Sequence, residues 1–348
     1  MQNETPRLTS LAHGGGCGCK IAPGVLSELL ADMPLLTNYK DLLVGTETAD
    51  DAAVYRLNDE QALIATTDFF MPVVDDPYDF GRIAATNALS DIYAMGGTPI
   101  LALAIVGMPI NVLPAKTIQS ILRGGHDVCQ AAGIPVAGGH SIDSVEPIYG
   151  LVALGLAHPN LIRRNADAQV GDVLVLGKPL GVGVYSAALK KGQLDDQGYR
   201  ALIDTTTLLN RAGSDLTKLD GLHAMTDVTG FGLLGHAHEM AKGAGVNIEL
   251  DSDKVALLPG VVDLARAGHV TGASKRNWAS YGQAITGRVH EDELLRDLLT
   301  DPQTSGGLLV ACREDVVSSV LSTFEQHGSQ PAVVGRVTAK GQGVVHVR

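Results

Sequence analysis

The sequence predicts an α+β (mixed α/β) protein with two domains of similar size, and three observations support this fold class. The chain has 348 residues, and since a domain commonly takes about 150 residues, two domains are expected. With 45% hydrophobic and 18% charged residues, each half can bury a hydrophobic core. Short apolar runs bounded by turn residues alternate with longer segments of helical periodicity, which is typical of mixed structure.

The first half of the chain begins as an irregular, glycine-rich segment that contains a short predicted helix over 24–30. Beyond it, apolar residues at helical spacing predict a helix over 81–95, which ends at Gly96, and another over 116–132, which ends at Gly133. Short, turn-bounded runs of β-favouring residues predict strands at 42–45, 52–57, 63–67, 100–107, 135–137 and 148–156.

A polar stretch over 158–171 predicts the junction between the two domains, because it interrupts the alternating pattern. After this junction the same periodicities predict strands at 173–176, 246–250, 307–312, 332–337 and 344–347. They predict helices at 184–190, 199–219, 233–243 and 314–327. The chain is therefore expected to divide into three parts, over 1–40, 41–157 and 158–348.

Composition and charge exclude several classes of function. The formal net charge is −12 and no cluster of Lys and Arg is present, so a nucleic-acid-binding surface is not expected. The longest apolar runs, such as 99–109, fall well short of the roughly 20 residues that a membrane span requires. The N-terminus is polar and lacks the apolar core of a signal peptide. Four cysteines are too few for a disulfide framework, so a reducing, cytoplasmic location is expected.

Residues 13–20 read HGGGCGCK, and several interpretations of this segment stay open. A phosphate-binding Walker loop has glycine immediately before its lysine and follows a strand. Here Cys19 precedes Lys20 and no strand precedes the glycines, so this interpretation is excluded. A zinc site would use His13, Cys17 and Cys19, but the spacing lacks the usual pair of Cys-x-x-Cys type. A disordered tail with incidental cysteines is the plain structural alternative.

A functional interpretation explains more features of the same segment together. Glycines let a backbone approach a ligand closely and would make the segment a mobile lid. We expect Cys17 to lie exposed on this lid, where the neighbouring Lys20 would favour its thiolate and so make it a nucleophile.

Acidic residues recur at positions where a strand ends, a strand begins or a helix turns. Each alone is explained by a cap or a turn, but Asp91 lies among apolar residues within a helix, where an unpaired charge costs several kcal/mol. Asn87 shares its helix face. The candidates are Asp50, Asp51, Asp68, Asp91 and Asp227.

Carboxylates in such places suit Mg²⁺, which prefers oxygen ligands and usually takes one or two carboxylates plus substrate phosphates. An acidic cluster repels a nucleotide triphosphate unless divalent ions bridge the two, so the pattern predicts metal and phosphate together. The stretch AGGHSID at 137–143 is expected to turn at its glycines and to offer N–H groups to phosphate or base. A plain turn is the alternative there.

The combination of motifs resembles the selenophosphate synthetase (selenide, water dikinase) family, within the superfamily that includes aminoimidazole ribonucleotide synthetase. Besides HGGGCGCK and AGGHSID, the resemblance is carried by TADDAAV at 48–54, TTDFF at 66–70, NALSDIYAMGG at 87–97, TDVTGFG at 226–232 and DPQTSGGL at 301–308. The aspartate motifs are shared across the superfamily, whereas HGGGCGCK is specific to the family.

The resemblance implies a kinase-type transferase that converts ATP, selenide and water to selenophosphate, AMP and orthophosphate, and so supplies activated selenium for selenocysteine and selenouridine. It implies Mg²⁺ and often K⁺ as cofactors. It implies that Cys17 and Lys20 are catalytic and that the Mg²⁺ ligands are Asp51, Asp91 and Asp227. The nucleotide contacts that it implies are Lys20, Thr48, Ala49, Asp50, Asp68, Asp91, Gly139, His140 and Ser141.

The same resemblance implies an aminoimidazole ribonucleotide synthetase-like fold, in which 1–40 is flexible, 41–157 binds ATP and Mg²⁺, and 158–348 is a C-terminal α/β domain. The sheet of the N-terminal domain would be completed across a homodimer, and a selenium-delivery protein is a further expected partner. Two alternatives stay open: an ATP-dependent cyclo-ligase of the same superfamily, and a non-enzymatic, thiol-containing metal-binding module.

Overall fold

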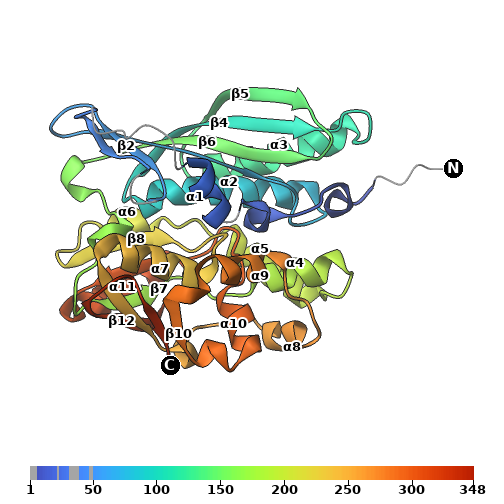
Figure 1. Ribbon diagram of the computed structural model, residues 1–348. Coiled ribbons are helices and arrows are strands. Elements are labelled where there is room, and N and C mark those ends of the chain that lie inside the picture. The colour runs from blue at the N-terminus through green and yellow to red at the C-terminus, as the bar shows by residue number, and fades with distance from the viewer. Residues whose placement is uncertain (1–5, 22, 31–38, 47–49) are drawn as a thin grey trace.

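The computed structural model contains two β-sheets, one from the first half of the chain and one from the second half. Helices pack between and around the sheets (Figure 1). The structure describes residues 6–21, 23–30, 39–46 and 50–348. Within these residues, no helix is long and apolar enough to cross a membrane.

The first sheet has six strands in the order β1-β2-β3-β6-β4-β5. All neighbouring pairs are antiparallel except β4 and β5, which are parallel. The edge strand β5 is exposed along almost its whole length. The strands are β1 (Leu42–Val44), β2 (Ala53–Arg56), β3 (Ala62–Phe70), β4 (Thr98–Met108), β5 (Val136–Asp143) and β6 (Ile148–Ala157).

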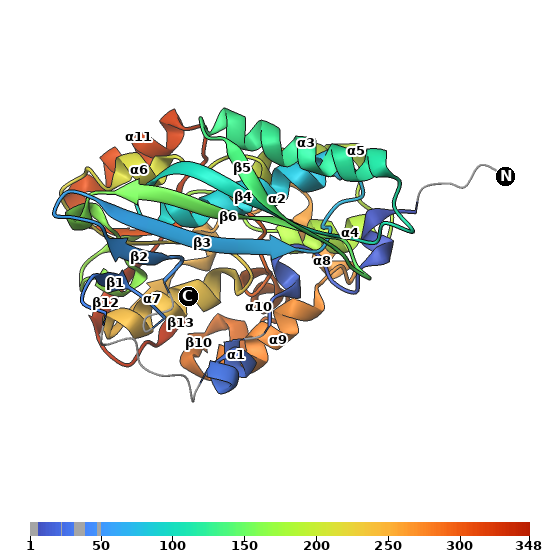
Figure 2. The ribbon, with the colours of Figure 1, turned by 90° about the horizontal axis from the view of Figure 1, so that it is seen from above.

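Helix α2 (Pro77–Ala94) lies between the two sheets (Figure 1), and from above it lies behind the strands of the first sheet (Figure 2). It begins at a proline in its first turn, and Asp76 caps it by accepting from the N–H of Asp79. From Phe80 to its end every residue except Arg82 is buried, as expected for a helix covered on nearly all sides. Its polar residues are therefore forced into the interior. Helix α3 (Ala115–Ala131) packs beside it.

The second sheet has seven strands in the order β10-β13-β9-β12-β7-β11-β8, and helices cover both of its faces. In β7, Leu174 and Leu176 face one core, and Val175 between them faces the other, as strand geometry requires. The strands are β7 (Val173–Leu176), β8 (Leu222–Asp227), β9 (Val246–Leu250), β10 (Ile285–Gly287), β11 (Leu308–Cys312), β12 (Ala332–Lys340) and β13 (Val345–Val347).

The helices of this half connect the strands and close the junction with the first half. They are α4 (Val182–Lys190), α5 (Asp196–Thr206), α6 (Ala212–Leu216), α7 (Gly232–Ala244), α8 (Val261–Arg266), α9 (Gly272–Tyr281), α10 (Glu293–Leu299) and α11 (Val317–Gln326). Near the N-terminus, α1 (Pro23–Leu30) confirms the short predicted helix and packs against α9.

Two expectations about secondary structure are corrected, and one strand near the site is added. The single helix predicted over 199–219 is two helices, α5 and α6, separated by irregular chain. The glycine turn predicted at 137–141 is part of strand β5, in which Gly139 approaches β4 so closely that a Cβ would lie 2.1 Å from the carbonyl oxygen of Ala104. The apolar segment before Asp227 is strand β8, which the sequence did not predict.

Candidate active site

The glycine-rich segment ends in one 3-10 turn, Gly16–Cys19 (η2), which lies at the junction between the two halves. The N–H of Gly16 donates to the carbonyl of Met71 at 2.9 Å, and the N–H of Cys17 donates to Oγ1 of Thr304 at 3.0 Å. Glycine is required at position 16, because its φ is +53° and a Cβ would lie 2.2 Å from Thr304 Oγ1. The segment is therefore docked against residues from both halves.

The thiol of Cys17 is buried, with 1% of the residue exposed, so the expectation of an exposed cysteine is wrong. Its Sγ donates to Oδ1 of Asn87 at 3.2 Å. Burial raises the pKa of Cys17 well above its ordinary value; the charge of Lys20 opposes this rise, and that of Asp68 adds to it. The charge of Lys20 thus favours the thiolate, as expected, but burial outweighs it and the thiol is neutral in this conformation.

Asn87, on α2, connects the glycine-rich segment to Asp68 by hydrogen bonds. Its Oδ1 also accepts from the N–H of Ser305 at 2.7 Å, and its Nδ2 donates to Oδ2 of Asp68 at 2.6 Å. Nζ of Lys20 lies 3.1 Å from the same Asp68 oxygen. Burial alone would lower the pKa of Lys20, but the charge of Asp68 raises it well above its ordinary value, so the group is an ammonium.

Three further aspartates interact electrostatically with one another: Asp91 and Asp227 are buried, and Asp51 is partly buried. Burial raises the pKa of all three, and the charge of Asp227 raises the pKa of the other two further. Each accepts a hydrogen bond from a hydroxyl: Thr226 for Asp51, Thr66 for Asp91 and Ser90 for Asp227. We call Cys17, Lys20, Asp51, Asp68, Asn87, Asp91 and Asp227 the aspartate–cysteine site.

The donor set of this site fits a magnesium ion that arrives with a phosphate. Among the described residues, no group of three or more His, Cys, Asp or Glu side chains lies close enough to hold a metal ion by itself. Mg²⁺ at nucleotide sites needs only one or two carboxylates and takes its other ligands from phosphate and water. Oδ2 of Asp51 is buried and has no hydrogen-bond partner among the described side chains, so it is an acceptor that lacks a donor.

Of the other residues predicted to contact nucleotide, those that the structure describes are not gathered at this site. Thr48 and Ala49 lie outside the described residues. Oδ1 of Asp50 accepts from the N–H of Asn165 at 2.8 Å. Gly139, His140 and Ser141 lie on the exposed edge strand β5 and line a different pocket of about 380 Å³, whose lining includes none of the aspartates.

Residues that sequence reasoning missed hold the site together from the second half. Nδ2 of Asn210 donates to Ser90 Oγ and to the carbonyl of Gly306, both at 2.8 Å. Lys178 is almost fully buried, and its Nζ donates to the carbonyls of Leu208 and Ser305 at 2.7 and 2.9 Å. For Ser305 the motif DPQTSGGL was a signal, but Asn210 and Lys178 lie in segments with no recognisable motif.

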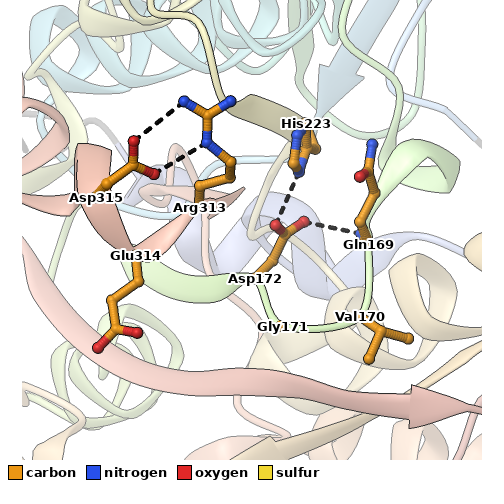
Figure 3. Close-up of a pocket in the computed structure, with 8 residues that line it drawn as sticks. All are labelled: Gln169, Val170, Gly171, Asp172, His223, Arg313, Glu314 and Asp315. Atoms are coloured by element: carbon orange, nitrogen blue, oxygen red, sulfur yellow. Dashed lines mark hydrogen bonds and ion pairs between the residues drawn. The ribbon is translucent and has the colours of Figure 1, made fainter.

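A separate pocket of about 710 Å³ lies on the second half, against the turn before β7 and the start of the chain after β11 (Figure 3). Four of its charged or titratable side chains are already paired: His223 contacts Asp172 at 2.8 Å, and Arg313 contacts Asp315 at 2.9 Å. No residue of the aspartate–cysteine site lines it, so we do not place the chemistry there.

Comparison with known proteins matches both halves of the chain. Residues 49–157 match the family described as AIR synthase related protein, N-terminal domain, and residues 169–348 match AIR synthase related protein, C-terminal domain. Among solved structures, AaThiL complexed with AMPPCP and TMP has a TM-score of 0.67 at 19% identity, covering 99% of this chain and 96% of that one. This likeness shows the fold.

Curated relatives are much more similar in sequence. The selenide, water dikinase of Pseudomonas straminea is 68% identical over 339 residues, which cover 97% of this chain and 95% of the relative. The protein of the same name from Paraburkholderia xenovorans (strain LB400) is 62% identical, covering 99% of this chain and 98% of the relative. That of Rhizobium meliloti (strain 1021) is 54% identical, covering 100% and 99%.

Proposed function

The chain belongs to the selenide, water dikinase family of AIR synthase-related proteins, and from this premise we propose a role for each part of the aspartate–cysteine site. The enzyme is a phosphotransferase that converts ATP, selenide and water to selenophosphate, AMP and orthophosphate. Two phosphoanhydride bonds break, while one P–Se bond and one P–O bond form. The observation that carries the site assignment is the meeting of Cys17, Lys20 and Asp68 around Asn87.

Lys20 is proposed to bind the phosphates of ATP. Its ammonium lies against Asp68 at the edge of the aspartates, and phosphoryl oxygens gain negative charge as the bond to the leaving group lengthens. A fixed cation at that place stabilises the transition state more than the ground state. Asp68 holds the ammonium in position before nucleotide arrives.

Cys17 is proposed to act on the selenium side of the reaction. It lies on the same turn as Lys20 and, through Asn87, is hydrogen-bonded to the group that holds Lys20. The thiol is buried and neutral in this conformation. In the proposed reaction it occupies the place beside the phosphates and excludes water from them, until selenide takes that place. Asn87 positions both side chains, so the segment and the aspartates are assembled together.

Mg²⁺ is proposed to be held by Asp51, Asp91 and Asp227 together with phosphate oxygens. When bound, it neutralises phosphate charge and orients the phosphates. Burial raises the pKa of these carboxyl groups, and a cation favours their ionised forms, so metal and nucleotide binding would release protons. A monovalent K⁺ is proposed alongside Mg²⁺ on the ground of the family resemblance.

A homodimer is proposed to bring Gly139, His140 and Ser141 to the nucleotide of the partner. The supporting observation is the edge strand β5, which pairs on one side with β4 and is exposed, since an exposed edge readily pairs with a second chain. Sedimentation analysis of the native chain is expected to give a dimer. A monomer with full activity would contradict this proposal.

The location and further partners are also proposals. All four cysteines are free thiols, which suits a reducing cytoplasm. A selenium-delivery protein is proposed as a partner because selenide is easily oxidised.

The nucleotide product tests the proposed reaction. Under anaerobic conditions with ATP, Mg²⁺ and selenide, we expect AMP to form only when selenide is present. Formation of ADP as the final product would favour an ATP-dependent ligase, and tight zinc retention without nucleotide turnover would favour a metal-binding module.

A further inference from the structure

A pocket of about 620 Å³ lies on the other side of the glycine-rich segment from the aspartates. One wall is the segment itself, including Gly14, Gly18 and Cys19, and the opposite wall comes from α4 and α9. The pocket does not include Asp51, Asp68, Asp91 or Asp227 in its lining. It is therefore a second compartment, which shares only the segment with the aspartate–cysteine site.

This pocket is basic, although the chain carries a net charge of −12. Lys20, Lys190, Lys191 and Arg276 line it, and no Asp or Glu does so among the described residues. His13 also lines it and pairs with Glu146 at 3.0 Å. We call this compartment the basic pocket. A concave surface with several cations and no carboxylate attracts small anions.

Two cations of the basic pocket, Lys190 and Arg276, are held by backbone carbonyls without a paired carboxylate, whereas Lys20 pairs with Asp68. Nζ of Lys190 donates to the carbonyl of Ala12 at 3.0 Å, and Nη2 of Arg276 donates to the carbonyl of Gly18 at 2.9 Å. Neither forms an ion pair with a described carboxylate within 4.0 Å. Their positive charge therefore acts on the segment and on the pocket without an ion-pair partner, and, besides the hydrogen bonds from His13, that of Lys190 helps to lower the pKa of Glu146.

The segment separates two chemically opposite compartments. Cys17 points to Asn87 on the acidic side, whereas Cys19, two residues later, lines the basic pocket. Lys20 belongs to both, since it lines the basic pocket while its Nζ contacts Asp68. Only the backbone of the glycine-rich segment would separate an anion in the basic pocket from the side chains of the aspartate–cysteine site.

We propose that the basic pocket is where the hydroselenide anion binds before it reaches the phosphoryl group. This inference rests on the proposed function, which makes selenide the second substrate. Hydrogen selenide is a stronger acid than hydrogen sulfide, so at neutral pH it is a monoanion. Hydroselenide is so small that it offers almost no shape, and its recognition must therefore come from charge. Approach from the basic side also keeps it away from the negative charge of ATP.

Charge-removing substitutions test the proposal in steady-state kinetics. Lys191→Gln is the cleanest variant, because Lys191 makes no hydrogen bond to the segment and instead donates to the carbonyl of Gly268. We expect the KM for selenide to rise roughly two- to fivefold, the effect of one charge several ångströms away in a partly solvated pocket, with the KM for ATP unchanged. Lys275→Gln is the matched control, since this exposed lysine lies on α9 outside the pocket.

A second measurement needs no turnover and reports the charge of the pocket directly. The probes are iodoacetate, an anion, and iodoacetamide, its neutral analogue, and alkylation of Cys19 is read by peptide mass spectrometry. The ratio of the two rates cancels the thiolate fraction. We expect this ratio to fall in Lys191→Gln and Arg276→Gln and to stay at the wild-type value in Lys275→Gln.

The outcomes distinguish a failure of the basic-pocket proposal from a failure of the proposed function. A ratio that does not respond to Lys191→Gln, or a KM that rises for ATP and not for selenide, overturns the proposal while the proposed function stands. A ratio that follows the charge in an enzyme that forms no selenophosphate leaves an anion pocket but overturns both the selenide assignment and the proposed function.

Discussion

Replacing Gly16 with alanine tests whether the docked segment is the active form of the enzyme. At φ = +53° the backbone is in the left-handed region, which is unfavourable for alanine, and the Cβ would lie 2.2 Å from Thr304 Oγ1. The threonine must then turn away and give up its 3.0 Å hydrogen bond from the N–H of Cys17. Together the two effects disfavour the docked turn by about 2–3 kcal/mol, which is roughly a 30- to 150-fold loss of the docked population.

The assay is selenide-dependent AMP formation under anaerobic conditions, with circular dichroism to confirm that Gly16→Ala folds. Gly133→Ala is the matched control, because Gly133 also has a positive φ, of +82°, but has no atom within 4 Å of the place of a Cβ. It is expected to lose some stability and keep its activity. A folded Gly16→Ala enzyme with more than half of the wild-type rate would refute the reasoning.

Four further substitutions and one binding experiment give independent predictions. Cys17→Ser should lose selenide-dependent AMP formation while Cys19→Ser loses less, as an AMP assay shows; equal losses would argue against a single catalytic cysteine. Asp51→Asn should cripple catalysis and be partly rescued by raised Mg²⁺, whereas no rescue at unchanged ATP affinity would make Asp51 structural. Burial raises the pKa of Glu239 from 4.5 to about 8, so its ionisation destabilises the fold progressively between these pH values. Because 22% of this side chain is exposed, we expect Glu239→Gln to gain only about 2 kcal/mol at pH 8 relative to pH 5 in denaturant unfolding, and a pH-independent difference would contradict this. Hydrogen exchange over 8–20 should slow when a non-hydrolysable ATP analogue and Mg²⁺ bind, and no change would mean that nucleotide does not gate the segment.

Local sequence pattern was sufficient where an element is buried on both faces or bounded by strong turn signals. The strands Val173–Leu176 and Val246–Leu250 lie where continuous or alternating apolar residues predicted them. The break between α5 and α6 was not predictable in this way, since Leu208 and Leu209 continue the apolar spacing. There the side chain of Asn210 is drawn into the interior by hydrogen bonds to Ser90 and Gly306, which are tertiary contacts.

The candidate site illustrates the same limit. Asp51, Asp68, Asp91 and Asp227 were all identified from sequence motifs, because each stands out from its local context. The burial of Cys17 was not foreseen, since glycine-rich sequence has no apolar pattern and the contacts that bury it come from Thr304 and Asn87, which are 287 and 70 residues away.

The transfer of a phosphoryl group to selenium is the central claim, and phosphorus NMR with selenium-77-enriched selenide tests it most directly. The protein is incubated anaerobically with ATP, Mg²⁺ and the labelled selenide, and the ³¹P spectrum is followed over time. We expect a new phosphorus resonance that is split by coupling to ⁷⁷Se, together with AMP and orthophosphate in equal amounts. Consumption of ATP without a selenium-coupled phosphorus signal would contradict the account.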